Sequence, residues 1–141
     1  MNKRAINVLL GNMEEMVNDL IEEYLQKIFS DHADIKCARV SSLDEFVEQG
    51  CTGSFDLCLL IPNNVLDSKR RTFGTGALEE SVHAIRTVKS ARPSSVIAID
   101  VFPEYAPVLL GAGADCYLDF VDFDGLKSAA ARCLNLPLAA R

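Results

Sequence analysis

The feature that most constrains the fold is a run of apolar residues, FDLCLLI at 55–61, which Pro62-Asn63-Asn64 ends. A strand with one face in water alternates apolar and polar residues, whereas a strand covered on both faces is apolar throughout. The segment 55–61 is of the second kind. Strands of this kind belong to parallel sheets that carry helices on both faces. The chain is therefore expected to be an α/β protein.

Other apolar segments predict the remaining strands, and segments with helical spacing of apolar residues lie between them. The expected strands are 5–10, 34–40, 55–61, 95–102 and 116–120, and the expected helices are 13–29, 42–50, 76–91, 106–112 and 122–135. Strands that alternate with helices form a parallel sheet with right-handed crossovers. We therefore expect a flavodoxin-like three-layer sandwich with five parallel strands in the order 2-1-3-4-5. A single domain over residues 1–141, with a core at about 5–135, suits this length.

Several side chains mark the expected ends of helices. Ser42 and Glu45 have the spacing of a capping box, so a short helix is expected to begin there and to end at Gly50. Asp122 or Asp124 is the expected cap of the last helix. Residues 34–40 alternate polar and apolar side chains, which predicts a strand near the edge of the sheet.

The charge and hydropathy of the chain exclude two classes of partner. The chain has 14 Lys and Arg against 20 Asp and Glu, which gives a net charge of −6. A surface that binds nucleic acid needs a basic patch to neutralise phosphates, so no nucleic-acid partner is expected. The longest apolar runs are far shorter than the roughly 20 residues of a membrane span, and the N-terminus is not a signal peptide. A cytoplasmic protein with no membrane partner is expected.

The cysteines and histidines predict no metal site. The five cysteines show no CxxC spacing and fall in or beside apolar segments, so reduced and mostly buried thiols are expected. The two histidines, His32 and His83, lack the spacing of paired metal ligands.

A parallel sheet of this kind binds its ligands at the carboxyl ends of the strands, so the residues at these ends are the candidate site. The strand ends are expected to gather Gly11, Asn12, Ile61, Pro62, Asp100, Asp119 and Phe120 around one crevice.

Two segments carry a resemblance to a known family. LLGAGADCYLDF (109–120) is similar to the segment ALEAGADDYLxKP that joins the fourth helix to the fifth strand in bacterial response-regulator receiver domains. FDLCLLIPNN (55–64) is similar to the family's PDLVLLDIxMP. The strand and long helix at the start of the chain also match the family in position. The chain therefore resembles a receiver domain over nearly its whole length.

The resemblance also implies that the family's chemistry is missing. Receivers transfer phosphate from a kinase histidine to an aspartate and hold Mg²⁺ with paired acids, whose places here fall on Gly11 and Asn12. The acceptor aspartate falls on Ile61, the phosphate-reading hydroxyl on Asp100 and the lysine on Phe120. These changes imply a degenerate receiver, or pseudo-receiver, that binds no Mg²⁺, takes no phosphate and acts in two-component signal transduction through protein–protein interaction.

Two alternatives from other classes stay open. Asp100 and Asp119 end neighbouring strands of the expected order and could form a relocated phosphoacceptor or a metal-dependent catalytic site. The same crevice could instead hold a small molecule, because Ile61 and Phe120 would make it unusually apolar. Bound Mg²⁺ would favour the first alternative, and a retained apolar ligand would favour the second.

Two further features are candidates for contact with a partner protein. The segment 62–75 is expected to be a long polar loop, and its cluster Lys69, Arg70 and Arg71 would suit a solvated loop, an acidic partner or a phosphate. The acidic side of the first expected helix would suit a basic partner. Tyr105 lies on the side through which receivers commonly self-associate, so the resemblance implies a homodimer as one form of partner.

Overall fold

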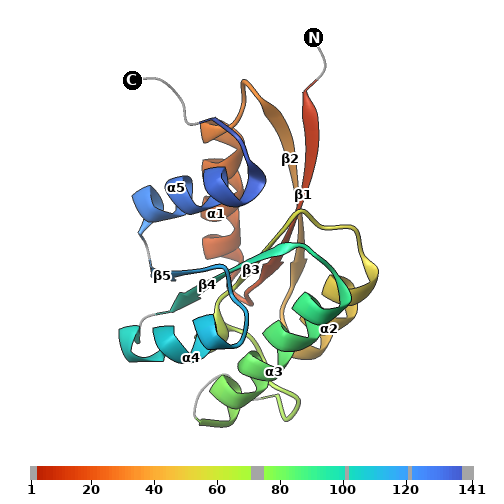
Figure 1. The fold of residues 1–141 in the computed structure, drawn as a ribbon, viewed down its shortest axis with the longest axis vertical. Coiled ribbons are helices and arrows are strands. Elements are labelled where there is room, and N and C mark those ends of the chain that lie inside the picture. Colours follow the sequence, from red (N-terminus) through yellow and green to blue (C-terminus); the bar gives the residue numbers. More distant parts are fainter. Residues whose placement is uncertain (1–2, 71–74, 101, 121, 138–141) are drawn as a thin grey trace.

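The computed structural model describes residues 3–70, 75–100, 102–120 and 122–137. The strands are β1 (Arg4–Gly11), β2 (Ala33–Val40), β3 (Leu57–Leu60), β4 (Ser95–Asp100) and β5 (Cys116–Asp119). They form one sheet in the order β2-β1-β3-β4-β5, and each neighbouring pair is parallel (Figure 1). The predicted fold class and strand order are confirmed.

Helices cover both faces of this sheet. They are α1 (Glu15–Ile28), α2 (Leu43–Thr52), α3 (Thr75–Ala91), α4 (Ala106–Gly111) and α5 (Phe123–Leu134), with single 3-10 turns at Pro62–Asn64 and Pro103–Tyr105. Helices α1 and α5 lie on one face, and α2, α3 and α4 lie on the other (Figure 1). No helix within the described ranges is both long enough and apolar enough to cross a membrane.

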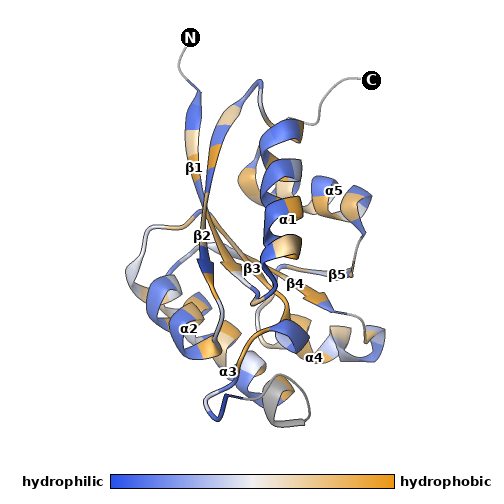
Figure 2. Ribbon diagram, turned by 180° about the vertical axis from the view of Figure 1, so that it is seen from behind, coloured by the Kyte–Doolittle hydropathy of each residue, from blue (hydrophilic) through white to orange (hydrophobic). Residues whose placement is uncertain are grey.

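Each strand supplies side chains to both halves of the core, because successive residues point to opposite faces of the sheet. On β1, Val8 and Leu10 face α1 and α5, whereas Leu9 faces α2 and α3. All four residues of β3 are buried, which explains the continuous apolar run that predicted it (Figure 2). β2 is an edge strand, as its alternating pattern predicted.

An ion-pair cluster joins α1 to the edge strand β2. Arg39 lies at its centre, and its carboxylate partners on α1 are Glu15 at 2.6 Å, Asp19 at 2.9 Å and Glu22 at 2.7 Å. Part of the apolar side of α1 is not covered by the rest of the described chain. Met16 and Leu20 belong to that side, yet they are 78% and 55% exposed.

The helix α2 begins as predicted but ends later. Ser42 accepts a hydrogen bond from the main-chain N–H of Glu45, and Glu45 accepts one from the Ser42 hydroxyl, so the predicted capping box is present. The prediction that Gly50 ends the helix is wrong, because α2 continues to Thr52. A Cβ on Gly50 would lie 2.8 Å from Cγ2 of Val88 on α3, so this glycine lets two helices approach closely.

The predicted loop at 62–75 is more ordered at its start than its polar sequence indicates. Val65 is fully buried, and Leu66 exchanges main-chain hydrogen bonds with Ser41 and Leu43 at 2.8 Å each. Asp67 is also buried. The loop is thus fixed to the start of α2 by backbone pairing, which leaves no polar signature in the sequence.

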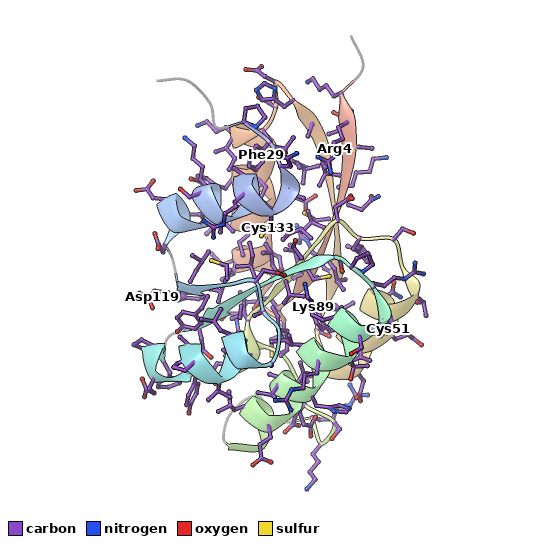
Figure 3. All side chains as sticks on the ribbon, viewed as in Figure 1. Arg4, Phe29, Cys51, Lys89, Asp119 and Cys133 are labelled. Atoms are coloured by element: carbon purple, nitrogen blue, oxygen red, sulfur yellow. The ribbon has the colours of Figure 1, made fainter. Side chains whose placement is uncertain are left out.

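One strand end and the burial of the cysteines differ from the prediction, and the cap of the last helix agrees with it. The predicted strand 95–102 ends at Asp100. The five cysteines are free thiols, but only Cys58 is buried; the other four, including the labelled Cys51 and Cys133, are half-buried (Figure 3). Asp122 caps α5 as predicted, because its carboxylate accepts from the N–H of Gly125 at 2.9 Å.

Candidate functional site

The predicted site residues meet along the carboxyl edge of the sheet. The N–H of Ile61, just after β3, donates to the carbonyl of Gly11 at 3.0 Å. Asp100 and Asp119 are paired in the register of β4 and β5, and the N–H of Phe120 donates to the carbonyl of Asp100 at 3.0 Å. The expectation that these strand ends lie side by side is therefore correct.

At the end of β1 the chain carries a glycine and a buried amide. A Cβ on Gly11 would lie 2.9 Å from side-chain atoms of both Leu60 and Phe46, so only glycine fits beside them. The next residue, Asn12, is 2% exposed. Its main-chain N–H continues the β1–β2 ladder by donating to the carbonyl of Val40 at 3.0 Å.

The side chain of Asn12 lies at the centre of an amide network. Its Nδ2 donates to Oδ1 of Asn18 at 3.0 Å and to the carbonyl of Glu14 at 3.1 Å, and its Oδ1 accepts from Nδ2 of Asn64 at 2.7 Å. Asn18, which is fully buried, donates back to the carbonyl of Asn12 at 3.0 Å. The carbonyl of Asn64 accepts from the N–H of Met13 at 2.7 Å. These bonds tie the β1–α1 loop to the turn after β3.

A neighbouring amide holds Asp100. The side-chain amide of Asn63 donates to Oδ1 of Asp100, which also accepts from the N–H of Phe102 at 3.3 Å. Asp100 is 1% exposed. The hydroxyl of Tyr117 donates to the main-chain carbonyl of Asp100 at 3.3 Å, and burial, with Asp100 and Asp119 nearby, raises the pKa of Tyr117 to about 12. Asp119, in contrast, is exposed at the end of β5 (Figure 3).

The remaining site residues, Ile61 and Phe120, line an apolar cavity of about 70 Å³. Ile61 is 3% exposed. The cavity lies between the carboxyl end of the sheet and helices α1 and α5. Its other apolar lining residues are Val17, Leu20, Ile21, Ile99, Leu118, Phe123 and Leu126.

The ends of β1 and β3 do not fit a magnesium ion, which prefers several oxygen ligands, carboxylates among them. Gly11 has no side chain, Ile61 has an apolar one, and the side-chain oxygen of Asn12 already accepts a hydrogen bond from Asn64. Within the described ranges, no three His, Cys, Asp or Glu side chains gather in a way that could hold a metal ion.

The sequence interpretation missed the amides that organise this edge. Asn63 and Asn64 were interpreted only as turn residues, and Asn18 was not singled out. A signal for Asn18 was present, because it lies among apolar residues on the buried side of α1, and a buried amide needs hydrogen-bond partners. No comparable local signal marks the turn, since its partner Asn12 is far away in sequence.

The residues proposed to contact a partner lie on separate elements. Lys69 and Arg70 are exposed in the loop before α3, and Arg71 lies outside the described residues. The main chain of this loop is held at Ser68, whose N–H and hydroxyl both donate to the carboxylate of Glu80 on α3, at 2.8 and 2.7 Å.

The fourth of these residues, Tyr105, is half-buried on the α4 side of the sheet. Its ring packs against that of Phe102, with centroids 5.3 Å apart.

Neither a family model nor a curated protein sequence matches the chain. Solved structures match its fold. The receiver domain of a sensor histidine kinase from Pseudomonas aeruginosa, with a magnesium ion in its active-site cleft, is 17% identical with a TM-score of 0.69. That likeness covers 93% of this chain and 98% of the other.

Two more solved structures have a similar fold. A two-component response regulator from Clostridium difficile is 11% identical with a TM-score of 0.70, covering 92% of this chain and 96% of the other. A putative CpaE2 pilus assembly protein from Sinorhizobium meliloti is 15% identical with a TM-score of 0.67, covering 91% and 99%. The chain thus has the CheY-like fold of response-regulator receiver domains, with parallel strands in the order 2-1-3-4-5.

Proposed function

We propose that the chain is a cytoplasmic signalling domain of the receiver type that accepts no phosphate on an aspartate and acts by binding another protein. The observation that carries this proposal is the environment of Ile61. The place where receivers present an acceptor aspartate is here an isoleucine, 3% exposed and turned toward an apolar cavity. An isoleucine side chain offers no nucleophile, and its surroundings would disfavour a charged phosphoryl group.

The amide network supports the same proposal. The resemblance implies that a phosphorylated receiver holds a metal ion and a phosphate in the gap between the ends of β1 and β3. Here Asn12 and Asn64 close that gap with a direct hydrogen bond of 2.7 Å. We therefore expect no requirement for Mg²⁺.

The relocated acceptor at Asp100 or Asp119 is the less favoured function. The carboxylate of Asp100 is 1% exposed and accepts hydrogen bonds from Asn63 and Phe102, so a phosphodonor could reach it only after β4 and the turn separate. Asp119 is exposed, but its neighbours Tyr117 and Phe120 supply no positive charge to stabilise a transferring phosphoryl group.

The small-molecule alternative has one observation in its favour, the apolar cavity itself. Its volume of about 70 Å³ is well below the roughly 300–1,000 Å³ of typical ligand pockets. This size favours a partner's side chain over a whole ligand.

An amide NMR titration with Mg²⁺ and then beryllofluoride, a mimic of the acyl phosphate, tests the proposal. We expect no saturable shifts at Gly11, Asn12, Ile61 or Asp100, and no gain of a phosphoryl group by mass spectrometry after incubation with acetyl phosphate. Saturable shifts centred on Asp100 and Asp119, or a phosphorylated aspartate, would overturn it.

The homodimer that the resemblance implies remains a separate prediction. Phe102, Val108 and Leu110 expose 40–46% of their surface on the α4 side, where such a dimer would form. Sedimentation equilibrium of the chain and of Val108→Asp decides it, because a dimer through α4 should dissociate in the variant.

A further inference from the structure

Helix α1 carries a row of exposed apolar side chains. Met13, just before the helix, is 38% exposed, Met16 is 78% exposed and Leu20 is 55% exposed. Met16 and Leu20 are four residues apart and therefore lie on one side of the helix, and Met13 lies in the loop that leads into it. Single exposed apolar residues need no explanation, but a continuous row beside a cavity marks a contact surface.

The cavity lies directly beside this row. Leu20 and its neighbour Val17 form the α1 wall, Phe123 belongs to the α5 wall, and Ile61 and Phe120 lie at the strand ends. In both ribbon views α1 and α5 lie next to each other (Figures 1 and 2).

The cavity continues into a more open hollow, and we call the two together the groove between α1 and α5. The hollow is lined by Leu20, Glu23, Tyr24, Gln26, Lys27 and Phe123, and the rings of Tyr24 and Phe123 pack together with centroids 4.9 Å apart. Leu20 lines both parts of the groove, so the exposed apolar row on α1 borders the groove at this residue.

The rim of the groove is acidic. Asp119 and Asp122 line the cavity, and Asp124 follows in the first turn of α5. Burial, together with the nearby carboxylates Asp124 and Asp122, raises the pKa of Tyr24. Glu23 lines the outer part of the same groove, together with one cation, Lys27.

The other carboxylates of α1 do not belong to this rim. Glu15, Asp19 and Glu22 are paired with Arg39 on β2. The positive charge of Arg39 therefore offsets these three carboxylates and not the carboxylates at the rim of the groove.

These features select one kind of occupant. A second copy of the chain would bring an acidic rim against an acidic rim, which is repulsive. A small molecule would fill the cavity but leave Met16 and Leu20 in water. An amphipathic helix accounts for both the cavity and the exposed row, because one of its apolar side chains can enter the cavity while others cover the row on α1.

We propose that the groove between α1 and α5 binds a helix of a partner protein, that this helix carries Lys or Arg beside its apolar face, and that one of its large apolar side chains fills the cavity at Ile61 and Phe120. This inference rests on the proposed function, since it names the partner class. It also gives the two altered receiver positions a role: the substitutions that remove phosphate chemistry build an anchor pocket.

A designed peptide tests the inference without knowledge of the natural partner. The probe is a Leu/Lys peptide of about 18 residues, or five helical turns, with leucines on one face. The matched control is a peptide of the same composition in which the leucines share no face. In amide NMR titrations the amphipathic peptide should shift Val17, Leu20, Phe120 and Phe123 saturably, and added salt should weaken its binding.

Matched variants locate the binding site. Leu20→Asp places a charge in the groove, whereas His83→Asp introduces an aspartate at an exposed residue of α3, on the other face of the sheet (Figure 1). We expect at least a tenfold loss of affinity from the first variant and none from the second. Met16→Asp, at a side chain that is 78% exposed, provides the same test if Leu20→Asp does not fold.

A third titration uses free indole, a small apolar probe for the cavity alone. Several outcomes would overturn the inference: no saturable binding, equal binding of the control peptide, shifts centred on α4, or tighter binding of indole than of the peptide. These outcomes are distinct from failure of the proposed function. The Mg²⁺ and beryllofluoride titration reports on Asp100 and Asp119, so a chain that proves phosphorylatable can still bind or fail to bind the peptide.

Discussion

The side-chain amide of Asn64 donates to Oδ1 of Asn12 at 2.7 Å, across 52 positions of sequence. Asn12 in turn bonds to the buried Asn18 of α1, and Asn63 holds the carboxylate of Asp100. Amides therefore connect the ends of β1, β3 and β4, at the edge where the resemblance predicts a metal ion and a phosphate. A network with satisfied donors and acceptors gives this edge one defined arrangement.

Removing the centre of the network should destabilise the fold. Asn12→Ala leaves Oδ1 of Asn18, which is fully buried, without its donor from residue 12. Such a loss costs about 1–3 kcal/mol, so we expect the free energy of unfolding in urea to fall by that amount. Asn7→Ala, at an exposed amide on the same strand, should change it by less than about 0.5 kcal/mol. Equal midpoints for the two variants would show that the network contributes no stability.

Gly50 and Gly111 should respond in opposite ways to alanine. Alanine favours a helix over glycine by about 1 kcal/mol, which alone predicts that both variants are stabilised. At Gly50, however, the new Cβ would lie 2.8 Å from Val88, whereas at Gly111 nothing lies within 4 Å. Since overpacking costs about 1–3 kcal/mol, we expect Gly50→Ala to lower the thermal midpoint and Gly111→Ala to raise it slightly. A rise in both would mean that α2 and α3 separate without cost.

Gly50 also illustrates what the sequence could predict. The positions of the strands and helices followed from local patterns, because apolar runs and helical spacing are properties of neighbouring residues. The strand order followed from the flavodoxin-like arrangement that five alternating β/α units of this size favour. The end of α2 did not, because the helix continues through Gly50 to pack on Val88, a residue of another helix. A glycine that ends a helix and one that permits close packing look identical in sequence.

The location of the candidate site could be predicted from the sequence, but the hydrogen bonds within it could not. Parallel topology alone brings Gly11, Ile61 and Asp100 to one edge. The bond between Asn12 and Asn64, however, depends on the geometry of two loops distant in sequence. The exposure of Met16 could not be predicted either, since helical spacing does not reveal how much of an apolar side α5 covers.

The capping box of α2 should give a pH-dependent contribution to stability. Hydrogen bonds from Ser41 and Ser42 lower the pKa of Glu45. A carboxyl whose pKa is lower in the folded state stabilises the fold above its unfolded pKa of about 4.3, and this contribution is lost as pH falls through the folded value. Ser42→Ala should therefore cost about 1 kcal/mol at neutral pH and less at low pH.

Urea unfolding of this variant at about pH 7 and about pH 3, on either side of the carboxyl range, measures the difference. Ser128→Ala, at an exposed serine on α5, is the control and should show no such change with pH. A cost for Ser42→Ala that is the same at both pH values would mean that Glu45 does not depend on this cap.

Burial should slow the alkylation of Cys37 and Cys58. The thiolate is the reactive form, so a raised pKa slows alkylation. Burial raises the pKa of Cys58 to about 11 and that of Cys37 to about 12. At about pH 8 we expect iodoacetamide to label Cys37 and Cys58 at least tenfold more slowly in the folded chain than in urea, because each pKa unit costs a factor of ten in thiolate. Peptide mass spectrometry measures the rates, and equal rates with and without urea would contradict the prediction.

Placing a carboxylate at residue 61, where the resemblance predicts an acceptor aspartate, should destabilise the fold without adding phosphate chemistry. Ile61→Asp places a carboxyl among apolar side chains that include Ile99 and Leu118. Burial raises the pKa of such a group, so the destabilisation should grow as pH rises and reach about 3–5 kcal/mol once the group is charged. Ile61→Val should cost only about 1 kcal/mol, with no dependence on pH.

Urea midpoints at about pH 5 and about pH 8, below and above the raised pKa of a buried carboxyl, compare the two variants. If Ile61→Asp is as stable as Ile61→Val at the higher pH, water reaches this position and the acceptor place is open. The expected result is instead a variant that is both unstable and unreactive toward acetyl phosphate. One carboxylate supplies neither the paired acids nor the lysine that the resemblance predicts at the places of Gly11, Asn12 and Phe120.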